Sequence, residues 1–121
     1  MMSFKIHKKD KYTVVKIIAE KLDTMVAPTL KSELVLLNTD GVQNIIIDLS
    51  QSRYCDSSGL SAILVANRLC KNSGGTLVIT GLQEAVKNLI TISQLDSILN
   101  IADTLEDSIE LLKEKVIGDE E

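Results

Sequence analysis

The stretch NIIIDLSQSRYCDSSGLSAILVANRLCK, residues 44–71, decides the fold of this chain. Its first part, residues 44–49, is a continuous apolar run, which is typical of a central strand covered on both faces. A polar loop over residues 50–56 follows. Apolar residues at helical spacing then predict a helix over 57–72, which ends before Gly74. A buried strand that leads directly into a long helix indicates an α/β fold.

The segments on either side continue the alternation of strands and helices. Upstream, the sequence predicts two strands and a helix, over residues 4–9, 12–19 and 23–39. Downstream, it predicts a strand, a helix, a short edge strand and a last helix, over residues 76–82, 84–95, 98–102 and 106–116. Strand–helix–strand units join parallel strands through right-handed crossovers. The sequence therefore predicts an α/β fold with a mixed, largely parallel β-sheet and packed helices.

The length of 121 residues is that of one domain. We expect a single domain over residues 1–121, with its core between about residues 4 and 116. The acidic tail, residues 118–121, is expected to be solvated.

Composition and charge exclude several function classes. The net charge of −4 and the sequence pI of about 5.0 argue against nucleic acid as the main ligand. The start of the chain lacks the apolar segment of a signal peptide, and no apolar run reaches the roughly 18 residues of a membrane span. Two cysteines and one histidine are too few for a disulfide framework or a zinc site. We therefore expect a cytoplasmic protein with no cofactor and no bound metal.

The helix over 57–72 has a wide apolar arc and an opposite, polar arc. At 100° per residue, Ser57 lines up with Ser61, Leu64 and Arg68, and Leu60 falls on that polar side. We expect Leu60 and Leu64 to be exposed. Two leucines on the solvent side of a helix would form the apolar centre of a contact surface.

Ser57 lies at or next to the N-terminus of this helix, whereas Ser58 points toward the core side. Unpaired N–H groups and the helix dipole favour negative charge there, so a phosphate could be accommodated on the Ser57 hydroxyl. The simpler interpretation is that Asp56-Ser57-Ser58 is an ordinary capping sequence.

Catalytic interpretations of the same segment lack the necessary parts. The sequence around Ser57 lacks the first glycine of the G-x-S-x-G serine hydrolase motif, and the only histidine, His7, lies about 50 residues upstream. Cys55 precedes a helix N-terminus but is expected to be a packed, passive thiol. We expect a protein that acts by binding, not an enzyme.

Residues 44–70 resemble the core motif of STAS domains, the sulphate-transporter and anti-sigma-factor-antagonist family. The likeness centres on Asp56-Ser57-Ser58-Gly59-Leu60, after an apolar strand and before an apolar helix. It extends to Leu22-Asp23 with Ala27 and Leu30, and to the strand and helix that follow Gly75. It covers roughly residues 4–116. The resemblance implies a β–α superhelix with a mixed sheet.

The resemblance also implies a function. In stand-alone bacterial members, the first serine of the motif is phosphorylated by an anti-sigma factor that is also a serine kinase of the histidine-kinase-like (GHKL) ATPase type. The unphosphorylated member binds this kinase and releases the sigma factor, and a phosphatase restores binding after phosphorylation. Carried over, the phosphorylation site is Ser57. The expected partner-binding residues are Asp23, Asp56, Ser58, Gly59, Leu60, Ser61, Leu64 and Arg68.

Two departures from the family pattern leave the phosphorylation site intact. Glu20-Lys21 stands where Gly-Glu is frequent, and Gln94 stands where glycine is usual. The first departure changes the charge beside the expected contact surface. An alternative from another class stays open: a non-phosphorylated STAS subunit, structural or ligand-binding, of a transporter or larger complex.

Overall fold

A five-stranded sheet forms the centre of the molecule. The computed structural model describes residues 3–117, with side chains to residue 115, so the acidic tail over 118–121 lies outside the described residues. The strand order is β1-β2-β4-β6-β7. These strands are Phe4–Lys8, Thr13–Ile17, Ile45–Asp48, Leu77–Thr80 and Asn100–Ala102.

The sheet is mixed and largely parallel, as the sequence predicts. Among the described strands, β1 and β2 form the one antiparallel pair, because a tight turn closed by Lys9 N–H donating to the Tyr12 carbonyl joins them (2.8 Å). The other pairs are parallel, and each is connected through a helix. The strands β4 and β6 lie in the middle, and their apolar residues are buried on both faces. The continuous apolar run over 44–49 is therefore the central strand that it predicts.

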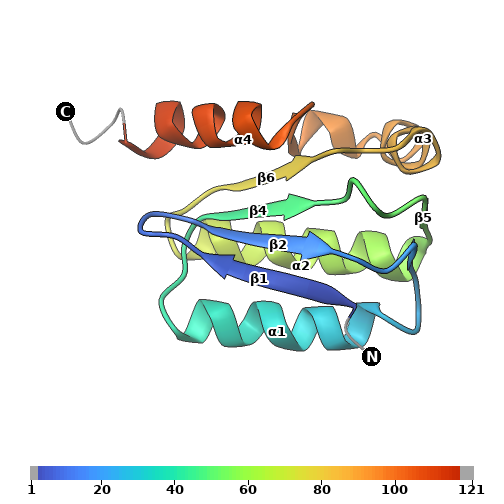
Figure 1. Cartoon of the computed structure of the whole chain (residues 1–121), viewed down its shortest axis with the longest axis horizontal. Helices are drawn as coiled ribbons and strands as arrows, with labels where there is room; N and C mark the ends of the chain where they lie inside the picture. Colours follow the sequence, from blue (N-terminus) through green and yellow to red (C-terminus); the bar gives the residue numbers. More distant parts are fainter. Residues whose placement is uncertain (1–2, 118–121) are drawn as a thin grey trace.

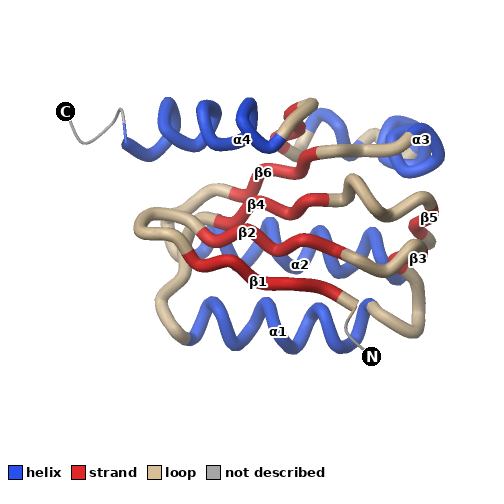
Figure 2. Tube along the Cα trace, viewed as in Figure 1, coloured by secondary structure: helices blue, strands red, loops and turns tan. Residues whose placement is uncertain are grey.

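Helices cover the two faces of the sheet unequally (Figures 1 and 2). Helices α1 (Ala27–Thr39) and α2 (Ser57–Asn72) lie on one face, the inner face, where they bury a large apolar cluster with alternate residues of β2, β4 and β6. Helix α4 (Leu105–Leu112) lies on the opposite, outer face. Helix α3 (Glu84–Ile92) precedes a short 3-10 turn over Leu95–Ser97.

Several elements differ from those predicted, and helix α3, for example, ends at Ile92 and not at about residue 95. Helix α1 begins at Ala27, not at residue 23, because residues 23–26 form a turn that leads into Pro28. The last helix keeps α-helical hydrogen bonding to Leu112 and continues as a wider, π-type turn over Lys113–Ile117. The loop over 50–56 contains a two-residue strand, β5 (Tyr54–Cys55), which pairs with β3 (Lys21–Leu22). Strands of two residues leave no periodic signal in a sequence.

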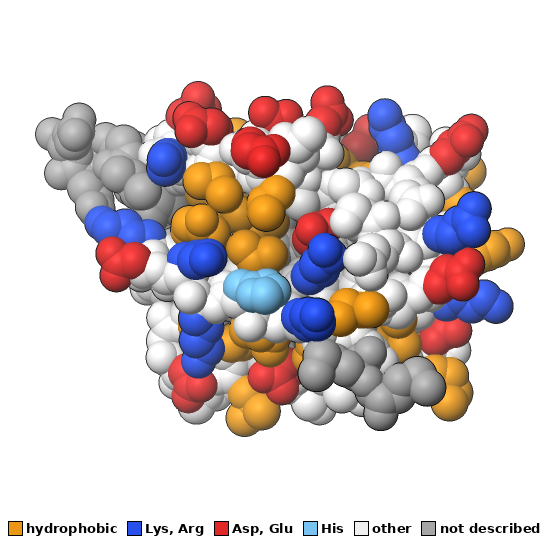
Figure 3. All heavy atoms as spheres, viewed as in Figure 1, with side chains coloured by type: hydrophobic (Ala, Val, Ile, Leu, Met, Phe, Trp, Pro, Cys, Tyr) orange, Lys and Arg blue, Asp and Glu red, His pale blue; other side chains and the backbone are white. Residues whose placement is uncertain are grey.

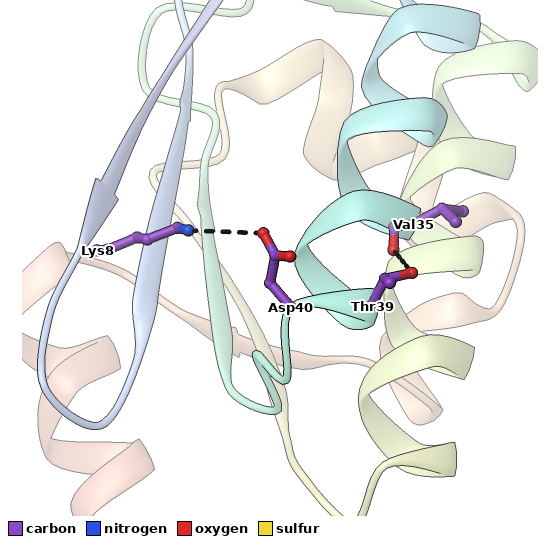
Figure 4. Close-up of polar contacts among 4 residues, drawn as sticks. All are labelled: Lys8, Val35, Thr39 and Asp40. Atoms are coloured by element: carbon purple, nitrogen blue, oxygen red, sulfur yellow. Dashed lines mark hydrogen bonds and ion pairs between the residues drawn. The ribbon is translucent and has the colours of Figure 1, made fainter.

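Polar contacts tie the ends of elements to the sheet. At the start of β4, the Asn44 amide donates to the Lys11 carbonyl (3.2 Å) and accepts from the Thr76 N–H (2.9 Å). At the end of α1, Lys8 Nζ lies 3.9 Å from Asp40 Oδ2, and the Thr39 hydroxyl donates to the Val35 carbonyl (Figure 4). Asn44 is buried, so its side chain joins the β1–β2 turn to the start of β6 through the interior.

Replacing Asn44 with alanine should destabilise the fold. Asn44→Ala removes both hydrogen bonds and leaves the Thr76 N–H without its acceptor. This loss should lower the free energy of unfolding by about 1–3 kcal/mol. Urea unfolding followed by circular dichroism measures this. Asn72→Ala, at the exposed end of α2, is the matched control and should change stability little. An equal loss in the two variants would mean that the Asn44 bonds contribute nothing net.

Candidate functional site

The N-terminus of α2 is held in place by the small sheet of β3 and β5. The Glu20 carbonyl accepts hydrogen bonds from the N–H groups of Arg53 and Tyr54 (2.8 and 3.2 Å), and the Asp56 N–H donates to the Leu22 carbonyl (3.3 Å). Ser52 is fully buried, and its hydroxyl donates to the Ala19 carbonyl (2.9 Å). These bonds fix the loop that connects the central strand β4 to the start of α2.

Asp56, not a serine, caps α2. Its backbone is extended, and its Oδ1 accepts a hydrogen bond from the Gly59 N–H at 3.0 Å. The other carboxylate oxygen accepts from the Thr24 hydroxyl at 3.4 Å, which links the cap to the turn before α1. Since a carboxylate already satisfies this orphan donor of the helix, the cap does not require the Ser57 hydroxyl.

Ser57 is the first residue of α2 and is exposed, whereas Ser58 is half-buried. This agrees with the predicted difference between the two serines. Among the described residues, no side-chain hydrogen bond of Ser57 is formed. The hydroxyl stands at the positive end of the helix dipole, where added negative charge is stabilised by about 0.3–1 kcal/mol.

Gly59 allows the first turn of α2 to lie directly on β3. A Cβ atom at this position would overlap the Leu22 carbonyl oxygen and would lie 2.9 Å from both Cys55 Sγ and Leu22 Cγ. Gly59 is therefore buried beneath the candidate site and positions it, rather than forming its surface.

The expectation that Leu60 and Leu64 are exposed is wrong. Leu60 is only 9% exposed and belongs to the main core, and Leu64 is half-buried against the same core. The reason is a second neighbour, because α1 packs along α2 on the inner face of the sheet and buries its own Leu30 and Leu34 there. Helix α2 therefore has two buried sides, one toward the sheet and one toward α1.

The remaining predicted contact residues are not all brought together. Asp23, half-buried, lies beside the cap of α2, and its Oδ1 accepts a hydrogen bond from the Met25 N–H (3.0 Å). Ser61 is half-buried one turn along α2. Arg68 is exposed, but it lies about 16 Å from Ser57 along the helix axis, from a rise of 1.5 Å per residue.

Two exposed apolar side chains at this end of the molecule have no periodic signal in the sequence. Met25, in the turn before α1, is 84% exposed, and Tyr54, in β5, is 63% exposed. Both come from segments of two to four residues, where periodicity cannot distinguish an outward from an inward side chain. A shallow hollow of about 300 Å³ lies between Tyr54 and the cap of α2, lined by Lys21, Asp23, Tyr54, Cys55 and Asp56.

The groups around Ser57 do not assemble a nucleophile and a base. Burial, and then the negative charge of Asp56, raise the pKa of the Cys55 thiol to about 11, so it stays protonated near neutral pH. His7 lies in the edge strand β1, in register with Val14 of the outer cluster, whereas α2 covers the inner face.

Within residues 3–117, no three His, Cys, Asp or Glu side chains cluster as metal ligands would. None of the helices in that range combines the length and the apolarity of a membrane span.

Comparison with known proteins gives a family and named relatives. The STAS domain family model matches residues 3–108. The chain is 33% identical over 85 residues to the anti-sigma-B factor antagonist of Bacillus subtilis (strain 168), which covers 70% of this chain and 77% of that protein.

Solved structures share the fold. A protein from Thermotoga maritima, described as an anti-sigma factor antagonist, superposes with a TM-score of 0.82 at 25% identity, over 91% of this chain and 94% of that one. The Bacillus cell fate determinant SpoIIAA, solved in its phosphorylated form, superposes with a TM-score of 0.70 at 19% identity, over 88% of this chain and 96% of that one.

Adding a single methyl group at Gly59 should disturb the support of the site. In Gly59→Ala the new Cβ meets the rigid Leu22 backbone, so α2 must shift, and the free energy of unfolding should fall by about 1–3 kcal/mol. Ser58→Ala, one residue away in the same helical turn, is the control and should stay within about 0.5 kcal/mol of the natural protein. Thermal and urea unfolding measure both. If Gly59→Ala were as stable as the control, α2 could move away from β3 at no cost in stability, and the close contact would not be required.

Proposed function

Because this chain belongs to the STAS domain family and is related to anti-sigma factor antagonists, we propose that it regulates transcription by binding an anti-sigma factor and releasing the sigma factor. The anti-sigma factor in this proposal is a serine kinase of the GHKL ATPase type. It binds the unphosphorylated protein and phosphorylates Ser57. A protein phosphatase removes the phosphate and restores binding.

The observation that carries the proposal is the exposed, unengaged hydroxyl of Ser57 at the start of α2. Asp56 supplies the cap, so a group can be added to Ser57 without removing a hydrogen bond on which the helix depends. Because Ser57 faces solvent, a kinase can reach it without unfolding the domain.

The transfer step needs only the hydroxyl from this chain. Ser57 Oγ attacks the γ-phosphorus of ATP held by the kinase, the bond from that phosphorus to the bridging oxygen breaks, and ADP leaves. The hydroxyl proton passes to a base of the kinase. In the reverse branch, water attacks the phosphorus in the phosphatase, inorganic phosphate leaves, and Ser57 regains its hydroxyl.

Phosphorylation would change the charge of the surface more than the fold. It adds about −1.5 to −2 charges at a helix N-terminus, where negative charge is favourable, so the helix is retained. The same charge lies next to Asp56 and close to Asp23, which makes the surface strongly negative. A partner surface matched to a neutral serine would then meet unpaired charge, which costs binding free energy.

We propose that the contact surface is centred on Met25 and Tyr54, with Ser57, Ser58 and Asp56 beside them. Asp23 and Ser61 lie at its edge. The hydrogen bond from Thr24 to Asp56 connects the turn that carries Met25 to the cap of α2. Gly59, Leu60 and Leu64 support this surface from below, and Arg68 would contact only a partner that extends along α2.

The comparisons support this proposal at the level of the family. The relative in Bacillus subtilis carries the name of an anti-sigma factor antagonist, and a fold neighbour is described in a phosphorylated form. The absence of phosphate transfer to Ser57 would instead favour the alternative, a non-phosphorylated STAS subunit of a larger complex.

Phosphate transfer is tested by intact mass after incubation with the kinase and ATP. The natural protein and Ser58→Ala should gain the mass of one phosphate, whereas Ser57→Ala should gain none, because Ser57 is exposed and Ser58 is half-buried. A phosphate gained by Ser57→Ala would show that another residue is the phosphorylation site.

The contact surface is tested by calorimetric titration with the kinase. Met25→Ala should bind at least about tenfold more weakly, since truncation of an apolar anchor in a protein interface costs about 2 kcal/mol or more. It should unfold at the same temperature as the natural protein, because Met25 is exposed. Leu36→Ala, at another exposed apolar position near the far end of α1, is the control and should bind normally. Equal affinities of the two variants would rule out Met25 as an anchor.

A further inference from the structure

The outer face of the sheet carries a second surface, on the opposite side of the sheet from α1 and α2. Helix α4 packs on β4, β6 and β7, and the outer face of β1 and β2 stays open beside it. Figure 3 looks onto this face. It shows a hydrophobic patch below α4, with lysine and histidine side chains below the patch and acidic side chains along α4 above it.

The pairing register identifies the basic side. Lys5 pairs with Lys16, and His7 pairs with Val14, which belongs to the outer cluster. Since side chains alternate between the faces of a strand, Lys5, His7 and Lys16 all project from the outer face. Lys8 projects to the other face and meets Asp40 at the end of α1 (Figure 4). Asp48, in register with Lys16, lies in the same row and accepts a hydrogen bond from the Ser50 N–H.

The apolar centre is partly exposed. Val14, Ile46, Val78 and Leu112 are buried between α4 and the sheet. The side chains that only partly cover them, called the outer patch here, are Tyr12, Ala102, Ile109 and Leu111.

The acidic side lies on α4, next to the outer patch. Glu106 and Glu110 are exposed and, at 100° per residue, lie about 60° and 100° around the helix from Ile109. Lys113, which follows them, lies 4.0 Å from Glu110, and both side chains are exposed.

The two sides match a segregation of charge along the whole chain. Residues 4–21 contain six lysines and two acidic residues, whereas residues 103–121 contain eight acidic residues and two lysines. Of these residues, Lys5 and Lys16 lie on the basic side of the outer patch, and Glu106 and Glu110 lie on its acidic side.

We propose that this face binds a second copy of the chain in a two-fold symmetric dimer. A two-fold axis that lies along the outer patch, between α4 and β2, brings the basic side of each copy onto the acidic side of the other. It also stacks the two outer patches. Such an interface is self-complementary, as a two-fold dimer requires. A different acidic partner would match the lysines but would meet Glu106 and Glu110 with like charge.

The dimer leaves the Ser57 surface open. Helix α2 lies on the inner face, so both copies would present Ser57, and the dimer would carry two partner sites at once. Dimerisation through the outer face does not require phosphorylation of Ser57.

Charge reversal tests the dimer with the full chain, by sedimentation velocity over a range of protein concentrations. The natural protein should reach twice the 13.2 kDa of one chain, and should dissociate in about 1 M salt, where charges are screened within about 3 Å. The double variants Lys5→Glu with Lys16→Glu, and Glu106→Lys with Glu110→Lys, should each dimerise at least tenfold more weakly. Circular dichroism should show that both stay folded, because Lys5, Glu106 and Glu110 are exposed and Lys16 is only half-buried.

Mixing the two reversed variants in equal amounts should restore a heterodimer, since each then supplies the charge that the other has lost. The control is Lys71→Glu with Lys87→Glu, the same change of net charge at exposed sites on α2 and α3, which should dimerise normally. A natural protein that stays monomeric up to about 1 mM would overturn the proposal. So would a dimer that neither reversed variant weakens, or one that the control weakens equally.

Discussion

The close contact between the first turn of α2 and the Leu22 backbone is the constraint on which the site depends. It exists only because Gly59 has no side chain, and it brings the Asp56 carboxylate to the Gly59 N–H and within reach of Thr24. The small β3–β5 sheet holds Leu22 in place for this contact. With the cap supplied by Asp56, the next residue is free to face solvent, so the position of Ser57 follows from the packing beneath it.

The sheet separates two surfaces with different chemistry. At the end of the inner layer, the exposed Met25, Tyr54 and Ser57 lie near the carboxylate of Asp56, where one added phosphate would change the charge strongly. On the outer face, a basic row and an acidic helix flank the outer patch. The buried apolar residues of the central strands β4 and β6 lie between these two surfaces. The proposed dimer and the proposed partner-binding surface would therefore use different sides of the domain.

The positions of the leucines in α2 show where periodicity is insufficient. A helical wheel correctly separates Ser57 from Ser58, because the sheet is the largest neighbour of the helix. It misplaces Leu60 and Leu64, because it assumes a single buried side. Helix α1 supplies the second buried side, and it is separated from α2 in sequence by a whole strand and loop. The exposure of Met25 and Tyr54 could not be predicted from the sequence for a related reason. Short turns and two-residue strands are too short to show a hydrophobic periodicity.

The sequence by itself determined the order of the main strands and helices, the buried central strand, the start of α2 and the outward direction of Ser57. Each of these depends on residues that are close together in the chain, such as the apolar run before Leu49 and the polar loop that follows it. Only the tertiary structure decided the pairing of β3 with β5, the burial of Leu60, the need for a glycine at position 59 and the outer patch. The physical reason is that these features are contacts between segments far apart in sequence. A local sequence pattern does not specify which distant segment packs against it.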